Sequence, residues 1–194
     1  MRFRFYLVFF LFLLPLLSCN WIAPAVTAAP VTVAPAKSTG SRYTLAYDLY
    51  FKRWGEFYFP FDDWKWWKSQ GIAESDLDPK ALSWCGAQGI MQIMPKTGIG
   101  LGLKNPWDPE ESVQAGIKYD DQVDTFFKPI EKTERRKFTF AGYNAGPGNI
   151  QKARKIANSD EWSVVAGRLH DITGKNSDET IGYVSRIYKL KEII

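Results

Sequence analysis

The sequence has little of the material from which metal and redox sites are built. His170 is the only histidine among 194 residues, and the two cysteines, Cys19 and Cys85, do not form a CxxC pair. These counts argue against a multi-histidine or cysteine-rich metal site, because such sites need three or four ligands of these types. We therefore expect neither a metal ion nor an organic cofactor.

The excess of positive over negative charge is also small. The formal net charge is +4, and about +2 remains when Arg2 and Arg4, which lie in a segment that we expect to be removed, are subtracted. A nucleic-acid-binding protein normally carries a concentrated basic stripe, so we expect no nucleic-acid partner. Aromatic residues are plentiful at 15%. We expect most of them in the core and some along a groove, because flat apolar faces stack on sugar rings.

The longest apolar run near the N-terminus, Phe5 to Leu17, is shorter than the about 20 residues that a transmembrane helix needs. It follows a basic start and ends at Ser18-Cys19, which resembles the bacterial lipobox. A small residue there gives a peptidase access, and the thiol accepts the lipid. We predict a lipoprotein signal peptide at residues 1–18 and lipidation of Cys19. The alternatives are an ordinary signal peptide with an incidental cysteine and an uncleaved anchor.

The composition after the signal predicts a tether and then one folded domain. Residues 19–40 are rich in Ala, Pro, Val and Thr, which cannot bury a core and favour a semi-extended linker. We expect the folded domain at 41–194. Trp21, rather than Asp, follows closely on Cys19, which in Gram-negative lipoproteins implies lipid anchoring at the outer membrane, facing the periplasm. A Cys19–Cys85 disulfide is the alternative; with Cys19 lipidated, Cys85 is expected to be a small packing residue.

The domain is expected to be mostly helical, because no segment shows the sustained alternation of a sheet. Asp108-Pro109 is a strong helix start, with a capping carboxylate followed by proline in the first turn. Asp62 or Asp63 is expected to cap the helix that ends near Glu74. The ranges expected to be helical are 42–54, 62–74, 88–94, 108–127, 133–142, 147–158, 161–170 and 178–192, with a glycine-rich loop at 98–102 and a small irregular β element at 75–83.

Three segments carry distinctive residue combinations in a fixed order. The first is Glu74-Ser75 followed by SWCGAQGIMQIMP at 83–95, the second is AGYNAG at 141–146, and the third is ETIGYV at 179–184. Together they resemble the soluble-type lytic transglycosylase family, whose pattern runs ES, S-x-x-GA-x-G-[LI]-MQ-x-MP, A-YN-x-G and a late YV. The resemblance spans roughly residues 70–190. It implies an all-α or mainly α, goose-type lysozyme-like fold with at most a small β element.

Glu74 is the expected catalytic residue. Cleaving a β-1,4 glycosidic bond requires a proton for the leaving oxygen, and a carboxylic acid in apolar surroundings keeps its proton near neutral pH because burial raises its pKa. Glu74 lies between a tryptophan-rich helix and a methionine-rich segment, which suits such a pocket. An isolated glutamate is more often a solvated charge at a helix end, and it is the ES motif that favours the pocket here. The resemblance implies that Glu74 acts on peptidoglycan glycan strands, first as an acid and then as a base.

The resemblance further implies a reaction without water. The C6 hydroxyl of N-acetylmuramic acid is the nucleophile, and an intramolecular nucleophile has an effective concentration that bulk water lacks. The product is a 1,6-anhydro ring. A hydrolytic lysozyme-type muramidase would need a second carboxylate, for which Asp76 and Asp78 are the nearby candidates. A non-catalytic wall-binding lipoprotein is the third interpretation, against which an intact Glu74, Ser83 and Gln92 speak.

The motif match also implies a set of substrate-binding residues. They are Ser83, Gln92, Met94, Tyr119, Tyr143, Asn144, Glu179 and Tyr183. Two of them have simpler interpretations: Asn144 as a turn residue and Glu179 as an acid in the first turn of a helix.

Three parts of the sequence depart from the family pattern. Gly142 stands where the family commonly has Ala before the Tyr. Ser112 and Asp120 replace the usual Asn and Leu in the helix after Asp108. The helix before Glu74 is richer in tryptophan and lysine than the usual aliphatic version. It is either a surface helix with one apolar face, or a surface on which tryptophans stack against glycan while lysines meet the carboxylates of peptide stems.

Overall fold

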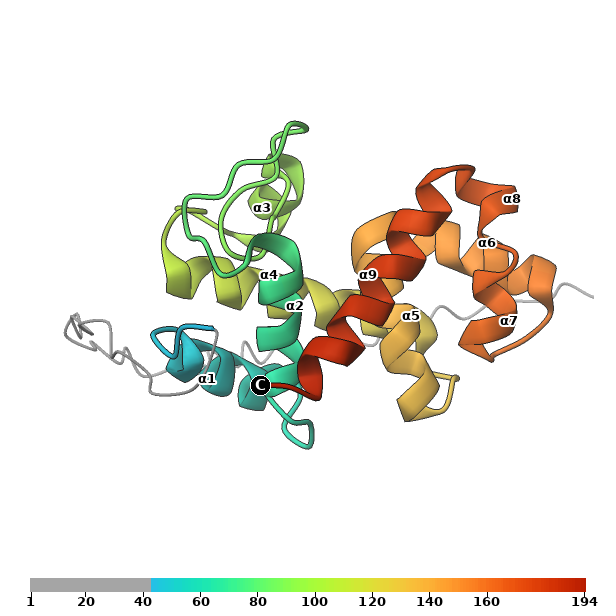
Figure 1. The fold of residues 1–194 in the computed structure, drawn as a ribbon, viewed down its shortest axis with the longest axis horizontal. Helices are drawn as coiled ribbons and strands as arrows, with labels where there is room; N and C mark the ends of the chain where they lie inside the picture. The colour runs from blue at the N-terminus through green and yellow to red at the C-terminus, as the bar shows by residue number, and fades with distance from the viewer. Residues whose placement is uncertain (1–42) are drawn as a thin grey trace, which may run out of the picture. The chain divides into compact units, whose positions relative to one another are not determined.

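The computed structural model describes residues 43–194, and the regular secondary structure of this part is helical (Figure 1). The elements are α1 (Asp48–Tyr58), α2 (Lys65–Ser75), α3 (Pro95–Leu101), α4 (Pro109–Asp124), η1 (Thr125–Phe127), α5 (Lys132–Ala145), α6 (Pro147–Ala157), α7 (Trp162–Ala166), α8 (His170–Thr173) and α9 (Asn176–Lys191). The expected fold class is confirmed. The small β element is reduced to isolated bridges within residues 82–93, later in the chain than expected.

Several expectations fall on residues that the structure does not describe. They are the signal peptide at 1–18, the lipidated Cys19 and the tether at 19–40. Within residues 43–194, no helix combines the length and the apolar character that crossing a membrane requires.

The helices whose ends carry capping signals lie close to where the sequence predicts them. The Asp108 carboxylate accepts a hydrogen bond from the N–H of Glu111 at 2.9 Å, and Pro109 occupies the first turn of α4. α2 begins at Lys65, whose N–H donates to the Asp63 carboxylate at 3.0 Å, and ends one residue beyond Glu74. The first helix begins and ends later in the chain than expected: α1 covers Asp48–Tyr58 rather than 42–54. The helix expected at 161–170 is divided into α7 and α8.

The expectation for residues 88–102 is wrong in both halves. Residues 88–94 form turns and bridges rather than a helix, because Gly89 and Gln92 take positive φ angles of 72° and 46°. α3 instead occupies the segment whose glycines predict a loop. Pro95 stands in its first turn, where the fixed φ of proline favours a helix and its missing N–H costs nothing. Gly102, at φ 79°, ends the helix.

Two hydrophobic clusters form the core of the described residues, and α2 has contacts with both. One cluster draws mainly on α5, α6, α7 and α9, and the other on α1 to α4 and the loop between α2 and α3. Trp66, Ala73 and Tyr119 pack against both clusters. α9 packs along α2 (Figure 1), so the helix that carries Glu74 is covered on more than one side.

The tryptophans and lysines around α2 therefore have structural partners. Trp67 is buried and stacks on Phe59 with ring centroids 4.7 Å apart. Lys68 is only 3% exposed and pairs with Asp48 of α1 at 2.6 Å. None of the tryptophans and lysines from Trp64 to Lys68 lines the cleft described below. Neither a surface helix with one apolar face nor a glycan-binding platform describes this segment.

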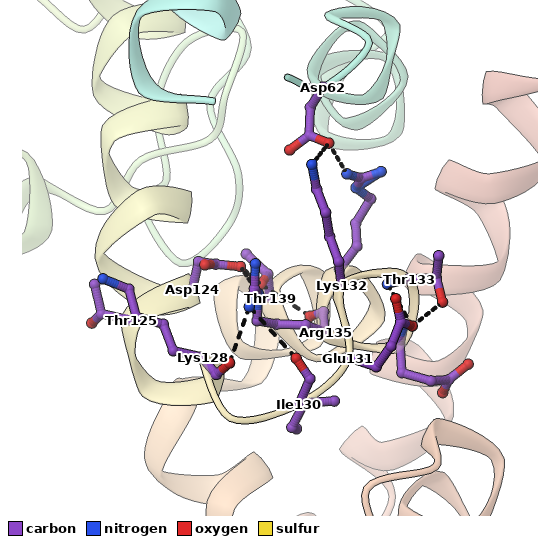
Figure 2. A network of polar contacts seen from close by, with 12 residues as sticks. Asp62, Asp124, Thr125, Lys128, Ile130, Glu131, Lys132, Thr133, Arg135 and Thr139 are labelled. Atoms are coloured by element: carbon purple, nitrogen blue, oxygen red, sulfur yellow. Dashed lines mark hydrogen bonds and ion pairs between the residues drawn. The ribbon is translucent and has the colours of Figure 1, made fainter. Parts of the chain in front are cut away.

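A polar network joins the turn before α2 to α5 (Figure 2). The Asp62 carboxylate, one of the two expected helix caps, instead forms an ion pair with Lys132 at 2.8 Å and accepts a hydrogen bond from Arg136 at 2.5 Å. A second carboxylate, Asp124 at the end of α4, binds Arg135 at 3.0 Å. These contacts fix the start of α2 and the end of α4 relative to α5.

Candidate active site

The end of α2, the loop at 81–94, the end of α5 and the first half of α9 enclose a cleft of about 510 Å³. Its lining residues are Ala73, Glu74, Ser83, Trp84, Cys85, Ala87, Gln92, Met94, Tyr143, Asn144, Glu179, Gly182, Tyr183 and Arg186. The structure thus brings Glu74 together with seven of the eight residues expected to bind substrate. The exception is Tyr119, which lies behind the cleft wall.

Glu74 reaches the cleft from the last turn of α2, with its carboxyl group enclosed by protein atoms. This burial raises the pKa of Glu74 from 4.5 to about 7, because removal from water disfavours the charged form. A hydrogen bond from Tyr183 and the positive charge of Arg186 lower the pKa, and the negative charge of Glu179 raises it again. Burial is the largest of these effects on the pKa, so Glu74 retains its proton in a large fraction of molecules at neutral pH.

α9 supplies two side chains that fix the end of α2. The Tyr183 hydroxyl donates a hydrogen bond to Oε1 of Glu74 at 2.5 Å. The Arg186 guanidinium donates to the carbonyls of Ala73 at 3.1 Å and Ile72 at 3.3 Å in the last turn of α2, where the Ile72 carbonyl also accepts from the N–H of Asp76. Both contacts orient the Glu74 carboxyl group toward the cleft.

The loop at 81–94 is held against α2 and α4 by close contacts. The Ser75 hydroxyl donates to the Ile90 carbonyl at 2.8 Å, so the serine after Glu74 connects the helix end to this loop. A Cβ on Gly116 of α4 would lie 2.7 Å from the Cβ of Met91, and a Cβ on Gly89 would lie 2.0 Å from the Pro106 carbonyl oxygen. Only glycine permits these approaches, which carry Ser83, Gln92 and Met94 to the cleft.

Gln92 and Ser83 each combine a structural contact with a place in the cleft wall. The Gln92 side-chain amide donates to the carbonyls of Gly89 at 2.9 Å and Ala81 at 3.1 Å, which leaves its oxygen as the group that it offers a ligand. The Ser83 hydroxyl accepts from the N–H of Ala87 at 2.9 Å. This contact closes the turn 83–87 at the rim of the cleft.

Tyr143 crosses from α5 to the same loop. Its hydroxyl donates to the Met91 carbonyl at 2.7 Å, and its ring packs on Tyr119 with centroids 5.1 Å apart. Tyr119 therefore supports Tyr143 from α4 instead of lining the cleft. Burial, followed by the nearby charge of Glu74, raises the pKa of Tyr143 well above its ordinary value, so the phenol remains protonated.

The remaining expected residues lie on the wall formed by α5 and α9. Asn144 accepts a hydrogen bond from the Thr180 hydroxyl at 2.7 Å, which fixes its side-chain oxygen and leaves its NH₂ group to face a ligand. Glu179 is in the first turn of α9 and also lines the cleft. It thus fits both interpretations of its position, a helix-end acid and a cleft residue.

Asp76 and Asp78, the candidates for a second catalytic carboxylate, do not line the cleft. Asp76 is exposed and pairs with Arg186 at 3.2 Å, and Asp78 accepts from the N–H of Lys80 at 2.8 Å. Asp76 is the residue directly after α2, and its backbone is left-handed, with φ 52°. The chain therefore leaves the helix at this residue, and the Asp76 side chain points away from the cleft that Glu74 faces. The second carboxylate of the cleft is Glu179.

Six lining residues are not among the expected site residues. Ala73, Ala87 and Gly182 contribute little side chain, whereas Trp84, Cys85 and Arg186 bring an aromatic ring, a thiol and a guanidinium group. Trp84 is 99% exposed and Cys85 is exposed, both on the turn 83–87, and Arg186 projects from α9. The expectation that Cys85 packs in the core is wrong, because the turn carries its side chain to the surface beside the Ser83 hydroxyl, at 3.1 Å. Trp84 and Cys85 occupy variable positions of a motif, so the pattern itself gives no signal for them.

Residues 43–194 contain no cluster of three or more His, Cys, Asp or Glu side chains that could hold a metal ion.

Comparison with known protein families finds one match within the chain. The family model described as "Transglycosylase SLT domain" matches residues 71–164. This range begins just before Glu74 and includes the loop at 81–94, α4 and the end of α5. It ends before α9, which supplies Tyr183 and Arg186.

Several relatives share the name "Membrane-bound lytic murein transglycosylase F". One from Stutzerimonas stutzeri is 36% identical over 99 residues, which is 50% of this chain and 20% of the relative. One from Pseudomonas fluorescens is 34% identical over 109 residues, 52% of this chain and 22% of the relative. One from Photobacterium profundum is 29% identical over 149 residues, 68% of this chain and 29% of the relative. The chain therefore spans well under a third of the length of these relatives.

Two solved structures have a similar fold. The 70 kDa soluble lytic transglycosylase from Escherichia coli superposes with a TM-score of 0.64 at 27% identity, over 77% of this chain and 24% of that chain. An inactive mutant of the lytic transglycosylase Slt from Pseudomonas aeruginosa superposes with a TM-score of 0.62 at 23% identity, over 77% and 24% of the two chains. At that identity the second similarity concerns the fold alone.

Proposed function

We propose that this chain, which carries a transglycosylase SLT domain over residues 71–164, is a lytic transglycosylase that acts on peptidoglycan glycan strands. It cleaves the β-1,4 bond between N-acetylmuramic acid and N-acetylglucosamine without water and leaves a 1,6-anhydro end. The observation that carries the proposal is Glu74, a carboxyl group with a pKa of about 7 at the base of a cleft. A general acid is most effective when its pKa lies near the working pH.

The first step is proton transfer from Glu74 to the glycosidic oxygen. The bond from C1 of N-acetylmuramic acid to that oxygen breaks, and the N-acetylglucosamine unit leaves with a new hydroxyl group. The N-acetyl oxygen of the same muramic acid residue closes onto C1 as an oxazolinium ion. Glu74 is now ionised, and the Tyr183 hydrogen bond at 2.5 Å stabilises its negative charge.

The second step uses the same carboxylate as a base. Glu74 removes the proton from the C6 hydroxyl, O6 attacks C1, and the bond from C1 to the N-acetyl oxygen breaks. The anhydro ring forms and Glu74 regains its proton, so the enzyme returns to its starting state without an external reactant. Because the nucleophile belongs to the substrate, one carboxyl group is sufficient.

The cleft walls provide the groups that hold the sugars in this proposal. Ser83 and the Gln92 oxygen serve the N-acetyl group from the loop, and Met94 offers an adaptable apolar surface. Asn144 and Glu179 bind hydroxyl groups from the opposite wall. Tyr119 supports this wall through Tyr143 rather than binding the substrate, as the contact between the two tilted rings indicates. Neither a nucleic acid nor a cofactor takes part.

A hydrolytic muramidase is the second candidate, and the position of Glu179 favours it. Glu179 lines the same cleft as Glu74 from α9, where it can direct a water molecule. The exposed positions of Asp76 and Asp78 remove those residues from that role.

Mass spectrometry of purified peptidoglycan digested with the chain separates these activities. We expect 1,6-anhydromuropeptides from the wild type and from Glu179→Gln at a reduced rate, and no products from Glu74→Gln. Products with a reducing N-acetylmuramic acid end, lost in Glu179→Gln, would establish hydrolysis instead. Binding to sacculi without any cleavage by the wild type would establish a non-catalytic wall-binding protein.

The proposed location is the cell envelope, with lipidation of Cys19 anchoring the domain to the outer membrane on its periplasmic side. The relatives' shared name, which describes them as membrane-bound, and the sequence around Cys19 support this location. Incorporation of labelled palmitate into the wild type, lost in Cys19→Ser, is the expected result. Equal labelling of the two, or release of the wild type without detergent, would contradict the anchor.

A further inference from the structure

A buried carboxyl group that plays no part in the proposed reaction lies on α4. Asp120 is 0% exposed, and its one hydrogen bond comes from the Gln70 side-chain amide, with 3.3 Å between Nε2 and Oδ1. Gln70 is itself fully buried on α2. The other oxygen of each side chain, Oδ2 of Asp120 and Oε1 of Gln70, has no hydrogen-bond partner among the residues that the structure describes.

Ionisation of Asp120 would be energetically unfavourable in the folded protein. A carboxylate is an acceptor only, so it has nothing to donate to Oε1 of Gln70. A buried negative charge without a cation loses its hydration and gains no compensating attraction. Among residues 43–194, no Lys or Arg side chain forms an ion pair with Asp120.

A protonated Asp120 resolves both unpaired atoms at once. The carboxylic acid has one O–H donor, and Oε1 of Gln70 is an acceptor on the group that already donates to Oδ1. We propose that Asp120 is a neutral carboxylic acid that forms two reciprocal hydrogen bonds with the Gln70 amide, and that this pair positions the helix that carries Glu74. The positioning part of the proposal rests on the proposed function, and the protonation part does not.

The surroundings of Asp120 favour its neutral form. The charged groups that act on it are all acidic: Glu74 from α2, and Asp121 and Asp124 from α4. The phenols of Tyr119, Tyr143 and Tyr183 complete the titratable groups facing it from α4, α5 and α9. Burial is the largest cause and raises the pKa of Asp120 well above its ordinary value; the Gln70 hydrogen bond comes next and lowers this pKa, and the negative charges of Glu74, Asp124 and Asp121 raise it further.

The Asp120–Gln70 pair lies close to Glu74. Gln70 and Glu74 are four residues apart on α2 and therefore project from the same face of the helix. Asp120 follows Tyr119, whose ring supports Tyr143. A neutral pair thus connects α2 to α4 close to Glu74 without adding a second negative charge there, which would oppose the ionisation that Glu74 undergoes during the reaction.

Asp120→Asn tests the protonation state through the pH dependence of stability. Asparagine has one donor and one acceptor, so it keeps both hydrogen bonds but does not titrate. A group with a raised pKa in the folded state contributes stability below its unfolded pKa of about 3.9, and this contribution is lost as the pH rises toward its folded value. The unfolding constant of the wild type, relative to that of Asp120→Asn, should therefore rise about tenfold per pH unit above pH 4.

Asp121→Asn is the matched control on the same helix. Because the Asp121 side chain is partly exposed, the unfolding constant of the wild type relative to that of Asp121→Asn should rise much less with pH. In infrared spectra recorded at pH 6, the folded wild type should show a C=O band of a protonated carboxylic acid that is absent from Asp120→Asn, in addition to the Glu74 band that both proteins share. A ratio that stays constant with pH, or the absence of this band, would overturn the neutral assignment. Both measurements retain their meaning if the chain has no lytic activity.

Apolar variants test the positioning role. Asp120→Leu and Gln70→Leu each leave one buried polar partner unpaired, whereas the double variant removes both polar groups. We expect each single variant, assayed well below its Tm, to lose about tenfold in kcat with KM little changed. The conservative Asp120→Asn should recover the kcat that Asp120→Leu loses, and the double variant should recover most of it.

The alkaline limb of the pH profile should be the same in Asp120→Asn as in the wild type, because both side chains are neutral in that range. Movement of this limb to lower pH would mean that the wild-type Asp120 is ionised and would overturn the proposal. Normal kcat in both single variants would overturn the positioning role while leaving the protonation result intact.

Discussion

At the scale of the residue, the chemistry depends on a carboxyl group that has been removed from water but still faces a cleft. Burial raises the pKa of Glu74 to about 7, so its proton remains available for transfer near neutral pH. The same burial ties the stability of the folded protein to pH. Two consequences can be measured on one variant.

Glu74→Gln should reduce kcat by a factor on the order of 10² to 10⁴, because it removes the general acid and base while preserving the shape of the side chain. The Tm difference between Glu74→Gln and the wild type should also change with pH. It should shift in favour of the variant as the pH increases from about 4.5 toward 7. The protonated glutamate stabilises the wild type below its unfolded pKa, and this contribution is lost through the folded pKa of about 7. Thermal unfolding at pH 4 and pH 8 tests this; an equal difference at both would contradict the raised pKa.

The Tyr183 hydroxyl sets the upper limit of the working range. Its hydrogen bond lowers the pKa of Glu74, so Tyr183→Phe should raise that pKa and move the alkaline limb of the pH–rate profile up by about one unit. Tyr188→Phe, on the same helix but outside the cleft, is the control and should leave the limb in place. If both variants gave the wild-type profile, the hydrogen bond to Glu74 would have no functional weight.

Trp84 offers a fully exposed aromatic face at the cleft rim. Stacking of a sugar ring on this face is expected to contribute about 0.5–1.5 kcal/mol. Trp84→Ala should therefore raise KM for glycan strands by about three- to tenfold and change kcat little. Trp107→Ala, which removes an exposed tryptophan outside the cleft, should leave KM unchanged. An equal effect of the two substitutions would argue against a sugar site at Trp84.

At the scale of the element, the loop at 81–94 is positioned by its contact with α4. Gly116 lets the Met91 side chain pack against this helix, and an added methyl group would meet three side-chain atoms of Met91 at 2.7 Å. The loop carries Ser83 and Gln92 into the cleft, so a displacement here reaches the substrate-binding residues.

Gly116→Ala should lower the free energy of unfolding by about 1–3 kcal/mol, because overpacking forces the loop away from α4. Gly100→Ala is the matched control in α3: an added methyl group meets nothing within 4 Å there, and alanine is the better helix former, so stability should hold or increase. Chemical denaturation gives both values. Destabilisation of the same size in the two variants would show that the Met91 contact is not the cause.

At the scale of the whole described domain, the two core clusters are connected by polar contacts as well as by α2. Asp62 holds Lys132 and Arg136 of α5 while its side chain is only 11% exposed (Figure 2). Partly buried ion pairs of this kind cost more to break than surface pairs, because the remaining charges lose their partner without regaining full hydration.

Asp62→Asn should therefore destabilise the fold by about 1–3 kcal/mol, since it removes the ion pair with Lys132 and weakens the charge-assisted hydrogen bond from Arg136. Asp171→Asn removes a carboxylate whose pair with Arg168 is 52% exposed on the arginine side and 43% on the aspartate side, and should cost less than about 1 kcal/mol. Urea denaturation of the two variants provides the comparison. If Asp62→Asn were no more harmful than Asp171→Asn, the Asp62 contacts would not hold the two clusters together.

The sequence by itself determined the helical class, the start of α4 and the identity of most cleft residues. These features depend on short-range patterns: the Asp108 carboxylate and Pro109 begin α4 through contacts within its first turn, and the ordered motifs indicate a known set of residues. Glu74 and seven of its eight expected companions meet in one cleft for this reason.

Only the tertiary structure decided how the remaining residues are used. Pro95 begins a helix where glycines predict a loop, because the preceding segment is held in turns against α4. Lys68 is a buried partner of Asp48, and Cys85 is exposed at the cleft rim. Asp120 and Gln70, 50 residues apart in the chain, form a buried pair beneath Glu74. Such outcomes depend on which distant side chains exclude water from one another, and local sequence patterns carry no record of that.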